Sequence, residues 1–334
     1  MVEGMLYNIR ESNCEEKVMT CKVAIVDSGI NEYFLKKTKK INFDSNEKWL
    51  DENGHGSKCA ALISNLAPET EIIPIKVLDK NLKCTSYKLI ETLKKLLDME
   101  VDIINLSLST SNNKEFFEIS EVCRQLTEQG KIIVASKANN GATSYPAESK
   151  FAIGVTGNPF VRNEEFWFDG RKSIQCVASR TPCIVDLGNM EYAFYSGNSK
   201  ATACFTGILA NKFDTIKNLS ISERTDYITR SAIKNRWTET DLIANIESCL
   251  VYECKGDEEI LEYLHIIFKE YNMKSDKYLY EYVGLDGILD AVRTIIGQYN
   301  LNLSEMELNL YDFMTLQSLS MKIRYALKGG YSNV

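Results

Sequence analysis

The feature that most constrains the fold is a change of hydrophobic pattern about two thirds of the way along this 334-residue chain. Up to about residue 235, short apolar runs alternate with segments of helical periodicity, which favours an α/β fold with a mostly parallel sheet. We predict buried strands over Lys22 to Val26, Ile72 to Val77, Val101 to Leu108, Lys131 to Ala135 and Phe151 to Val155. Helical stripes lie between them, formed by Leu89, Leu93, Leu96 and Leu97 and by Phe116, Ile119, Cys123 and Leu126.

A capping box at Ser220 to Glu223 begins one more helix, and the alternation stops after that helix. Residues 236–256 have no clear period and are predicted to be a linker or closing segment. From residue 257 the pattern is helical, with three apolar stripes: Ile260 to Tyr271, Leu285 to Ile296, and Leu316 to Leu327 after Thr315. We therefore expect an α/β domain over residues 1–235 and a small helical domain over residues 257–334.

Composition excludes several classes of protein. The net charge of −7 and the pI near 5.2 disfavour a nucleic-acid partner, because phosphate binding needs a basic surface. The basic run Lys36 to Lys40 is expected to be a solvated loop. The chain has no stretch of about 18 apolar residues, so the sequence excludes a membrane span. The first twenty residues contain no apolar signal-peptide core, which predicts a cytoplasmic protein.

The ten cysteines are expected to be reduced thiols, because disulfides are rare inside cells. Cys249 and Cys254 are spaced too widely for a typical metal-binding pair, and no histidine lies near them. Cys204 should lie inside a helix and face the core. We assign no metal and no cofactor.

Four chemically useful side chains stand where predicted strands end or predicted helices begin. Asp27 follows the first strand and Asn139 follows the fourth, while His55 and Ser199 each precede a helix. In an open α/β sheet such positions meet at the carboxyl edge of the strands, so all four can converge there. The chain has one other histidine, His265, which lies in a helical stripe and is expected to be a packing or surface residue.

Asp27, His55 and Ser199 are the parts of a nucleophilic system. Serine reacts at neutral pH when an imidazole takes its proton, and a carboxylate must orient that imidazole and stabilise its charged form. Taken singly, each residue has an ordinary structural explanation: Asp27-Ser28-Gly29 suits a tight turn, and Ser199 suits a helix N-cap. Those explanations do not account for the order of the segments along the chain.

That order, acid, then base, then nucleophile, resembles the subtilisin-like serine peptidases (subtilases). Asp27-Ser28-Gly29, Asp51 to Ser57 and Gly197 to Gly207 are similar to the family's three motifs, and the resemblance covers about residues 20 to 235. The chain departs from the motifs at Ser57, usually Thr, and at Asn198, Lys200, Ala203 and Cys204. None of these departures removes a proton-transfer group.

The resemblance implies further roles. The segment Val134 to Gly141 is similar to the family's oxyanion segment, which makes Asn139 the side-chain donor, or Asn140 if the register differs by one. Ile104 to Leu108 is similar to the strand that pairs with substrate, so Ser107, Leu108 and Ser109 are expected to bind peptide. Ser109-Thr110 stands where relatives usually have glycines, which implies a smaller pocket and narrow specificity. No acidic cluster aligns confidently with the family's calcium loops.

The helical tail resembles an acyl or peptidyl carrier protein through Tyr282 to Leu289 and Thr315 to Leu319. Gly287 occupies the place of the serine that would receive phosphopantetheine, so no thioester arm is expected. A generic helical bundle is the alternative.

Together these features predict an intracellular serine endopeptidase acting on a peptide or protein substrate. Secreted subtilases carry a long folding prosegment, whereas about twenty residues precede the first strand here. The resemblance therefore implies a dedicated processing enzyme inside the cell, such as one that removes a leader from a peptide natural-product precursor. The tail would then dock a biosynthetic partner. The alternative is a catalytically silent scaffold with the same docking role.

Overall fold

A computed structural model describes residues 20–35, 50–110, 115–242, 256–271, 278–302 and 307–328. Its centre is a seven-stranded sheet in the order β2-β1-β3-β4-β5-β7-β6, in which every neighbouring pair is parallel except β6 with β7. The strands are β1 (Lys22–Asp27), β2 (Glu71–Lys76), β3 (Ile103–Leu106), β4 (Ile132–Ser136), β5 (Ile153–Asn158), β6 (Phe166–Phe168) and β7 (Cys176–Ser179). The predicted α/β class with a mostly parallel sheet is confirmed.

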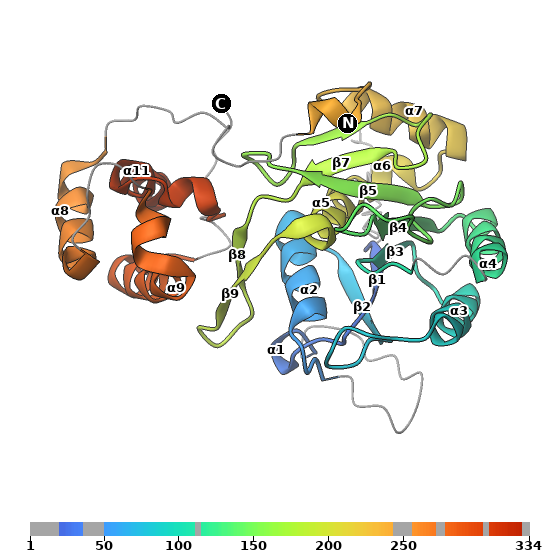
Figure 1. Cartoon of the computed structure of the whole chain (residues 1–334), viewed down its shortest axis with the longest axis horizontal. Helices are drawn as coiled ribbons and strands as arrows, with labels where there is room; N and C mark the ends of the chain where they lie inside the picture. Colours follow the sequence, from blue (N-terminus) through green and yellow to red (C-terminus); the bar gives the residue numbers. More distant parts are fainter. Residues whose placement is uncertain are drawn as a thin grey trace, which may run out of the picture.

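Helices cover both faces of this sheet, because side chains along a strand point alternately to its two faces. Val23 and Ile25 of β1 pack into a core with α2 (His55–Leu66) and α5 (Gly197–Asn211). Ala24 and Val26 face the opposite core, formed with α3 (Ser86–Lys95) and α4 (Phe116–Glu128). The result is three layers, with α3 and α4 along one side of the sheet (Figure 1).

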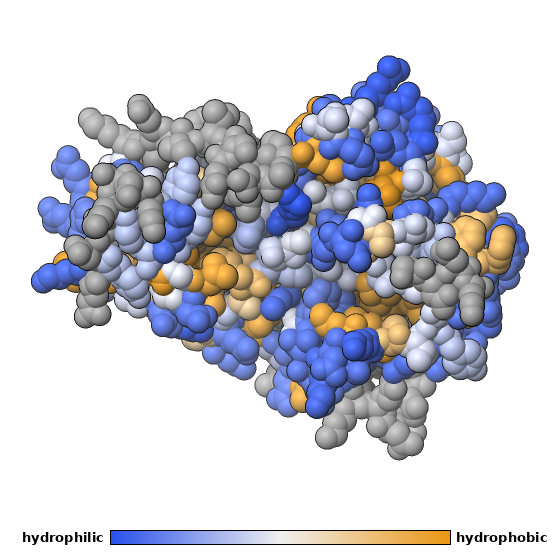
Figure 2. Space-filling view, in the orientation of Figure 1, coloured by the Kyte–Doolittle hydropathy of each residue, from blue (hydrophilic) through white to orange (hydrophobic). Residues whose placement is uncertain are grey.

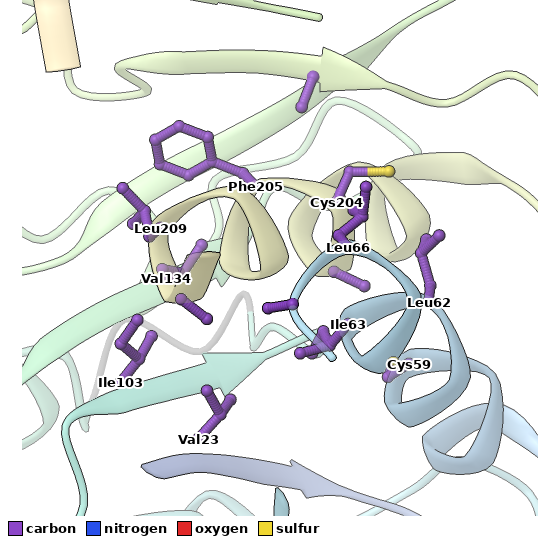
Figure 3. Packing of buried hydrophobic residues seen from close by; sticks show 14 of the residues in the cluster. Val23, Cys59, Leu62, Ile63, Leu66, Ile103, Val134, Cys204, Phe205 and Leu209 are labelled. Atoms are coloured by element: carbon purple, nitrogen blue, oxygen red, sulfur yellow. The ribbon is translucent and has the colours of Figure 1, made fainter. Parts of the chain in front are cut away.

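Helix α5 is buried along most of its length and packs against both α2 and the sheet. Small side chains let it approach α2, and at Gly207 an added Cβ would lie 2.8 Å from the Cβ of Leu66. Figure 3 shows Cys204, Phe205 and Leu209 of α5 among residues of α2 and the sheet. Cys204 is fully buried, which agrees with its predicted place inside a helix facing the core.

The remaining short helices are α1 (Glu32–Leu35), α6 (Phe213–Ile216) and α7 (Ile221–Ser231), with 3-10 turns at Leu96–Asp98 and Glu239–Asp241. Helix α7 begins with the predicted capping box. The Ser220 side chain accepts a hydrogen bond from the Glu223 amide, and the Glu223 side chain accepts one from the Ser220 amide. No helix in the part of the chain that the structure describes is both long and apolar enough to span a membrane.

Strand boundaries differ most from the prediction in β3 and β5. β3 ends at Leu106, so Ser107 and Leu108 lie beyond it, and β5 runs from Ile153 rather than from Phe151. The predicted strands also do not include β6, β7 or a separate hairpin of β8 (Cys183–Asp186) and β9 (Tyr192–Tyr195). These strands are only three or four residues long, too short for a periodic signal.

Past residue 256 the described chain forms α8 (Glu258–Ile267), α9 (Leu279–Tyr299) and α11 (Leu316–Leu327), with 3-10 turns at Lys269–Tyr271 and Leu310–Phe313. These C-terminal helices have a core of their own, which includes Ile184 and Tyr192 of the β8–β9 hairpin. The backbone also joins them to the hairpin, because the amide of Ile184 donates to the carbonyl of Leu308 at 2.9 Å. The hairpin thus reaches from the sheet to the helices (Figure 1), and hydrophobic residues gather near this contact (Figure 2).

One predicted helical stripe is wrong in detail. Gly284 has φ +69° inside α9, so the helix kinks there and does not continue one regular face. Leu285, predicted to be buried, is 52% exposed. The run Lys36 to Lys40, most of residues 236–256, and Cys249 with Cys254 lie outside the described residues.

Candidate active site

Asp27 and His55 form a buried acid–imidazole pair. Asp27 is the last residue of β1, and His55 is the first residue of α2. The Nδ1 of His55 lies 2.8 Å from Oδ1 and 3.0 Å from Oδ2 of Asp27, and the backbone amide of Ser28 donates to Oδ1 at 2.7 Å. The carboxylate is fully buried, and the imidazole keeps 17% of its surface exposed. This geometry fixes one ring nitrogen and leaves the other for a substrate or nucleophile.

The protonation of His55 follows from two opposed effects. Burial lowers the pKa of the imidazole, because it disfavours the charged ring. The neighbouring Asp27 carboxylate favours the charged ring and has the larger combined effect, together with the adjacent Cys59, so the pKa of His55 is raised above its ordinary value of 6.5. An imidazolium formed at this position is therefore stabilised.

Asp51 holds the turn that delivers His55 to this position. Its Oδ1 accepts hydrogen bonds from the Gly54 amide (2.7 Å) and the Ser28 hydroxyl (2.9 Å), and its Oδ2 accepts from the Ser57 amide (2.8 Å). Burial raises the pKa of Asp51, but these hydrogen bonds lower it by more, and the net pKa is below its ordinary value. A charged Asp51 thus ties the start of α2 to the end of β1.

Glycine is required next to His55. A Cβ on Gly56 would lie 2.1 Å from the carbonyl oxygen of Gly29 and 3.2 Å from Cβ of Asp27. Any larger residue would push α2 away from β1 and lengthen the Asp27–His55 contact.

Ser199 is the third residue of α5, whereas the prediction placed it just before the helix. The helix begins at Gly197, whose φ of +84° is a backbone conformation that favours glycine. The Ser199 hydroxyl donates to the backbone carbonyl of Ser107 at 3.1 Å, while the Ser107 hydroxyl donates to the Ser199 carbonyl at 3.2 Å. Rotation about the Cα–Cβ bond of Ser199 would be needed to turn its hydroxyl away from Ser107. In enzymes without substrate, the hydrogen bond between nucleophile and base is often long or poorly aligned.

Asn139 fits the predicted oxyanion position better than Asn140. Asn139 lines the same cleft as His55 and Ser199, and its Oδ1 accepts a hydrogen bond from the Asn198 amide at 3.1 Å. That bond orients the side-chain amide beside the start of α5. Asn140 instead uses its Oδ1 to accept from the Ala142 amide at 3.1 Å, which closes a local turn.

A cleft of about 580 Å³ contains the predicted site residues. Its lining includes His55, Asn139 and Ser199, together with all three predicted substrate-binding residues, Ser107, Leu108 and Ser109. Leu78, Leu82, Leu89 and Cys84 add apolar surface. Beyond Ser109, the backbones of Thr110 and Tyr145 exchange hydrogen bonds of 3.0 and 2.9 Å. This bridge holds the segment after the substrate-binding residues against the neighbouring loop.

Two neighbours of the Asp27–His55 pair were not predicted from the sequence. The thiol of Cys59 lies 3.7 Å from Oδ2 of Asp27 and 2.9 Å from the hydroxyl of Tyr195. The ring of Tyr195 stands edge-on to His55, with 5.8 Å between ring centroids. Cys59 is one helical turn after His55, so the (i, i+4) spacing could have revealed it. Tyr195 could not be found this way, because it comes from β9.

Lys200, beside the nucleophile candidate, is completely buried, which was not predicted from the sequence. Its Nζ donates to Oδ1 of Asn163 at 2.7 Å, to the hydroxyl of Ser179 at 3.0 Å and to the carbonyl of Ser179 at 3.3 Å. Buried charges are tolerated when such partners are present. Lys200 therefore anchors the first turn of α5 to the end of β7.

One potential metal-binding group occurs among the described residues, and it overlaps this site. Ligand atoms of Asp27, His55 and Cys59 all lie within 4.8 Å of one another. A metal ion there would occupy the oxygen and nitrogen atoms that form the acid–imidazole pair. The group is better explained as part of that pair.

The other candidate residues lie away from the cleft. His265 is exposed on α8, which is one of the two positions expected for it. The seven described cysteines are free, and six of them are buried.

The chain is similar in sequence to known proteins. The sequence profile of the subtilase family matches residues 19–247. The Minor extracellular protease Epr of Bacillus subtilis (strain 168) is 26% identical over 197 residues, covering 54% of this chain and 30% of that protein. The Intracellular serine protease of Paenibacillus polymyxa is 24% identical over 214 residues, covering 57% of this chain and 65% of that protein.

The fold is similar to that of a solved structure, a cold adapted subtilisin-like serine proteinase. The TM-score is 0.52 at 18% identity, and the match covers 67% of this chain and 86% of that one. The chain spans about a third or less of the length of Epr and of the Cell wall-associated protease of the same strain. Since the family profile extends over more than half of its residues, the chain belongs to the subtilase family.

Proposed function

We propose that this chain is a serine endopeptidase in which Ser199 is the nucleophile, His55 the general base and Asp27 the residue that orients His55. The observation that carries the proposal is the buried Asp27–His55 pair, with its contact of 2.8 Å, opening onto a cleft that also contains Ser199. Membership of the subtilase family supports the same assignment.

The reaction would proceed by acyl transfer. A peptide lies beside Ser107 to Ser109, where main-chain hydrogen bonds provide affinity and side-chain pockets provide specificity. His55 takes the Ser199 proton as the hydroxyl attacks the scissile carbonyl, and Asp27 stabilises the imidazolium. The Asn139 side chain and the Ser199 amide donate to the oxyanion. His55 then protonates the leaving amine, and water hydrolyses the acyl-enzyme by the same route.

The cleft favours a narrow specificity and thus a dedicated processing role inside the cell. Ser109 and Thr110 carry side chains where relatives usually have glycines, and the Thr110–Tyr145 bridge restrains this wall. One relative carries the name Intracellular serine protease. Leader removal from a peptide natural-product precursor would fit such an enzyme.

We further propose that residues 1–235 form the peptidase domain, residues 236–256 connect it, and residues 257–334 form a carrier-like helical domain. This last domain, which has Gly287 in place of an attachment serine, would dock a biosynthetic partner. Most residues of its hydrophobic core come from residue 257 onward, which supports this division.

A fluorophosphonate probe tests the catalytic assignment directly, because it reacts with activated serines regardless of peptide specificity. The native protein should be labelled once, at Ser199, and Ser199→Ala should not be labelled. Ser196→Ala is the matched control, since Ser196 lines the same cleft and its side chain makes no capping bond. Labelling that persists in Ser199→Ala, or no labelling of the native protein, would favour the silent scaffold.

A mixed peptide library tests the specificity. A dedicated enzyme should cut few library members, at related sequences, and Ser199→Ala should cut none. Cleavage at many unrelated sequences would contradict a processing role while leaving the peptidase assignment intact.

A further inference from the structure

A second cavity, of about 460 Å³, lies at the opposite edge of the sheet from the candidate active site. It lies where β4 and β5 begin, whereas Asn139 of the active-site cleft follows the end of β4. Helix α7, which lies at the upper right in Figure 1, forms another wall. We call this cavity the amino-edge pocket; its lining includes Lys131, Ile132, Ile153, Phe168, Arg224 and Ile228.

Arg224 is the unusual residue of the amino-edge pocket. Its side chain comes from α7 and only 8% of the residue is exposed. Nη2 donates to the carbonyl of Leu219 at 3.4 Å, and the buried Nε has no hydrogen-bond partner. Burial lowers the pKa of Arg224. A buried, unpaired polar group is costly, so natural proteins rarely leave one without a ligand or water.

The other polar side chains of the pocket have partners in the protein or lie open to solvent. Lys131 donates to the carbonyls of Leu96 and Leu97, and Lys150, which lies over the ring of Phe151 at 4.9 Å, is exposed. Thr127, Thr225 and Gln175 bond backbone groups. The unused hydrogen-bonding capacity is therefore concentrated on Arg224.

Charge in the pocket is of one sign. Lys131, Lys150 and Arg224 line it, and none of its lining residues in the described part of the chain is acidic. Asp98 and Asp102 act on Lys131 from outside the lining. In a chain of net charge −7, this local excess of cations favours an anion.

The walls of the pocket determine which kind of anionic molecule fits. Ile132, Ile153 and Phe168 give the pocket an apolar interior, and Ile221, which is 60% exposed, adds apolar surface to its lining. Pockets of roughly 300 to 1,000 Å³ with apolar walls and a few polar groups are typical of small-molecule sites. A guanidinium fork matches a carboxylate bidentately. We propose that the amino-edge pocket binds a small organic carboxylate with an apolar body, whose carboxylate group pairs with Arg224.

Octanoate is a suitable probe, and the Ser199→Ala protein separates this test from peptidase activity. Titration calorimetry should show one octanoate per chain. Octanol, which lacks the charge, and acetate, which lacks the apolar body, should each bind at least roughly tenfold more weakly. Sulfate should also bind weakly. Equal binding of acetate or sulfate would show a simple anion site and overturn the proposal.

Variants of α7 provide the matched comparison. Arg224→Met should weaken octanoate binding at least roughly tenfold, because a charge-assisted bidentate pair is lost. Arg230→Met, which removes the same charge from an exposed position on α7, should change it by less than about twofold. If octanoate does not bind, or binds equally to Arg224→Met, the proposal is wrong.

A readout on the native side chain guards against an unfolded variant. The Nε–H resonance of Arg224, assigned from its disappearance in Arg224→Lys, should shift on addition of octanoate and stay in place with octanol. An unchanged resonance at saturating octanoate would contradict the pairing. Failure of fluorophosphonate labelling would leave this result unaffected.

Discussion

Lys200 and Arg224 are both buried cations, one at each edge of the same sheet, and they differ in how their N–H groups are satisfied. Lys200 makes three hydrogen bonds to Asn163 and Ser179 at the carboxyl edge. Arg224 makes one long bond and leaves Nε unpaired beside a cavity at the amino edge.

The difference teaches how to separate structural from ligand-binding charge. At the carboxyl edge, Asp27 and His55 bond each other, and Lys200 makes three hydrogen bonds, so the protein itself supplies the partners of these charged groups. At the amino edge, the protein supplies only part of what Arg224 needs. Buried polar groups are normally paired, so the shortfall points to something that binds there.

Asp27→Asn should have the largest effect at the carboxyl edge. An amide in place of the carboxylate favours the wrong imidazole tautomer and costs about ten-thousand-fold in kcat in a chymotrypsin-like enzyme. His55 works as a base only when neutral, and its pKa is raised by Asp27. Activity of the native protein should therefore continue to rise as the pH increases beyond 6.5. In Asp27→Asn, this rise should occur at lower pH. Steady-state kcat/KM against pH measures both; an unshifted profile would count against the pairing.

Asn139→Ala should have the next largest effect. Loss of an oxyanion donor lowers kcat by about a hundredfold to a thousandfold, a range that comes from subtilisin. KM should change little, because the bond forms mainly in the transition state. Asn140→Ala is the matched control and should stay within about threefold of native kcat. The reverse ranking would move the oxyanion donor to Asn140.

Lys200→Met should lower stability rather than remove chemistry. The substitution leaves the buried Ser179 and the half-buried Asn163 without their donor, which costs roughly 1 to 3 kcal/mol. Urea unfolding would measure the loss. If Lys200→Met proved as stable as the native protein, Lys200 would not be the anchor of the first turn of α5.

Arg224→Met should have the smallest effect without ligand. Because Met removes a poorly paired buried charge and keeps the apolar stem, the free energy of unfolding should be unchanged or rise by about 1 kcal/mol. Its kcat/KM should stay within about twofold of native. A loss of stability as large as that of Lys200→Met would erase the contrast between the two cations.

Much of the fold could be predicted, because hydrophobic patterns report burial. The first four strands, α3, α4 and the Ser220 capping box follow directly from such patterns. β6 to β9 could not be predicted, since strands of three or four residues carry no measurable period. Leu285 is exposed directly after the kink at Gly284, and the apolar pattern does not reveal that kink.

The site was predictable to a similar degree. The positions of Asp27, His55, Asn139 and Ser199 at strand ends and helix starts indicated their convergence. Tyr195 and the partners of Lys200 could not be inferred, because contacts across more than a hundred residues, or between side chains of separate elements, depend on the folded arrangement. The unpaired Nε of Arg224 has no sequence signal at all.

The central claim is that the Asp27 carboxylate holds a proton on the imidazole that serves Ser199. With only His55 and His265 in the chain, two-bond nitrogen–proton NMR spectra can follow the His55 ring by itself. We expect His55 to titrate at higher pH than a free histidine, and closer to 6.5 in Asp27→Asn. Titration of His55 near 6.5 in both proteins would contradict it.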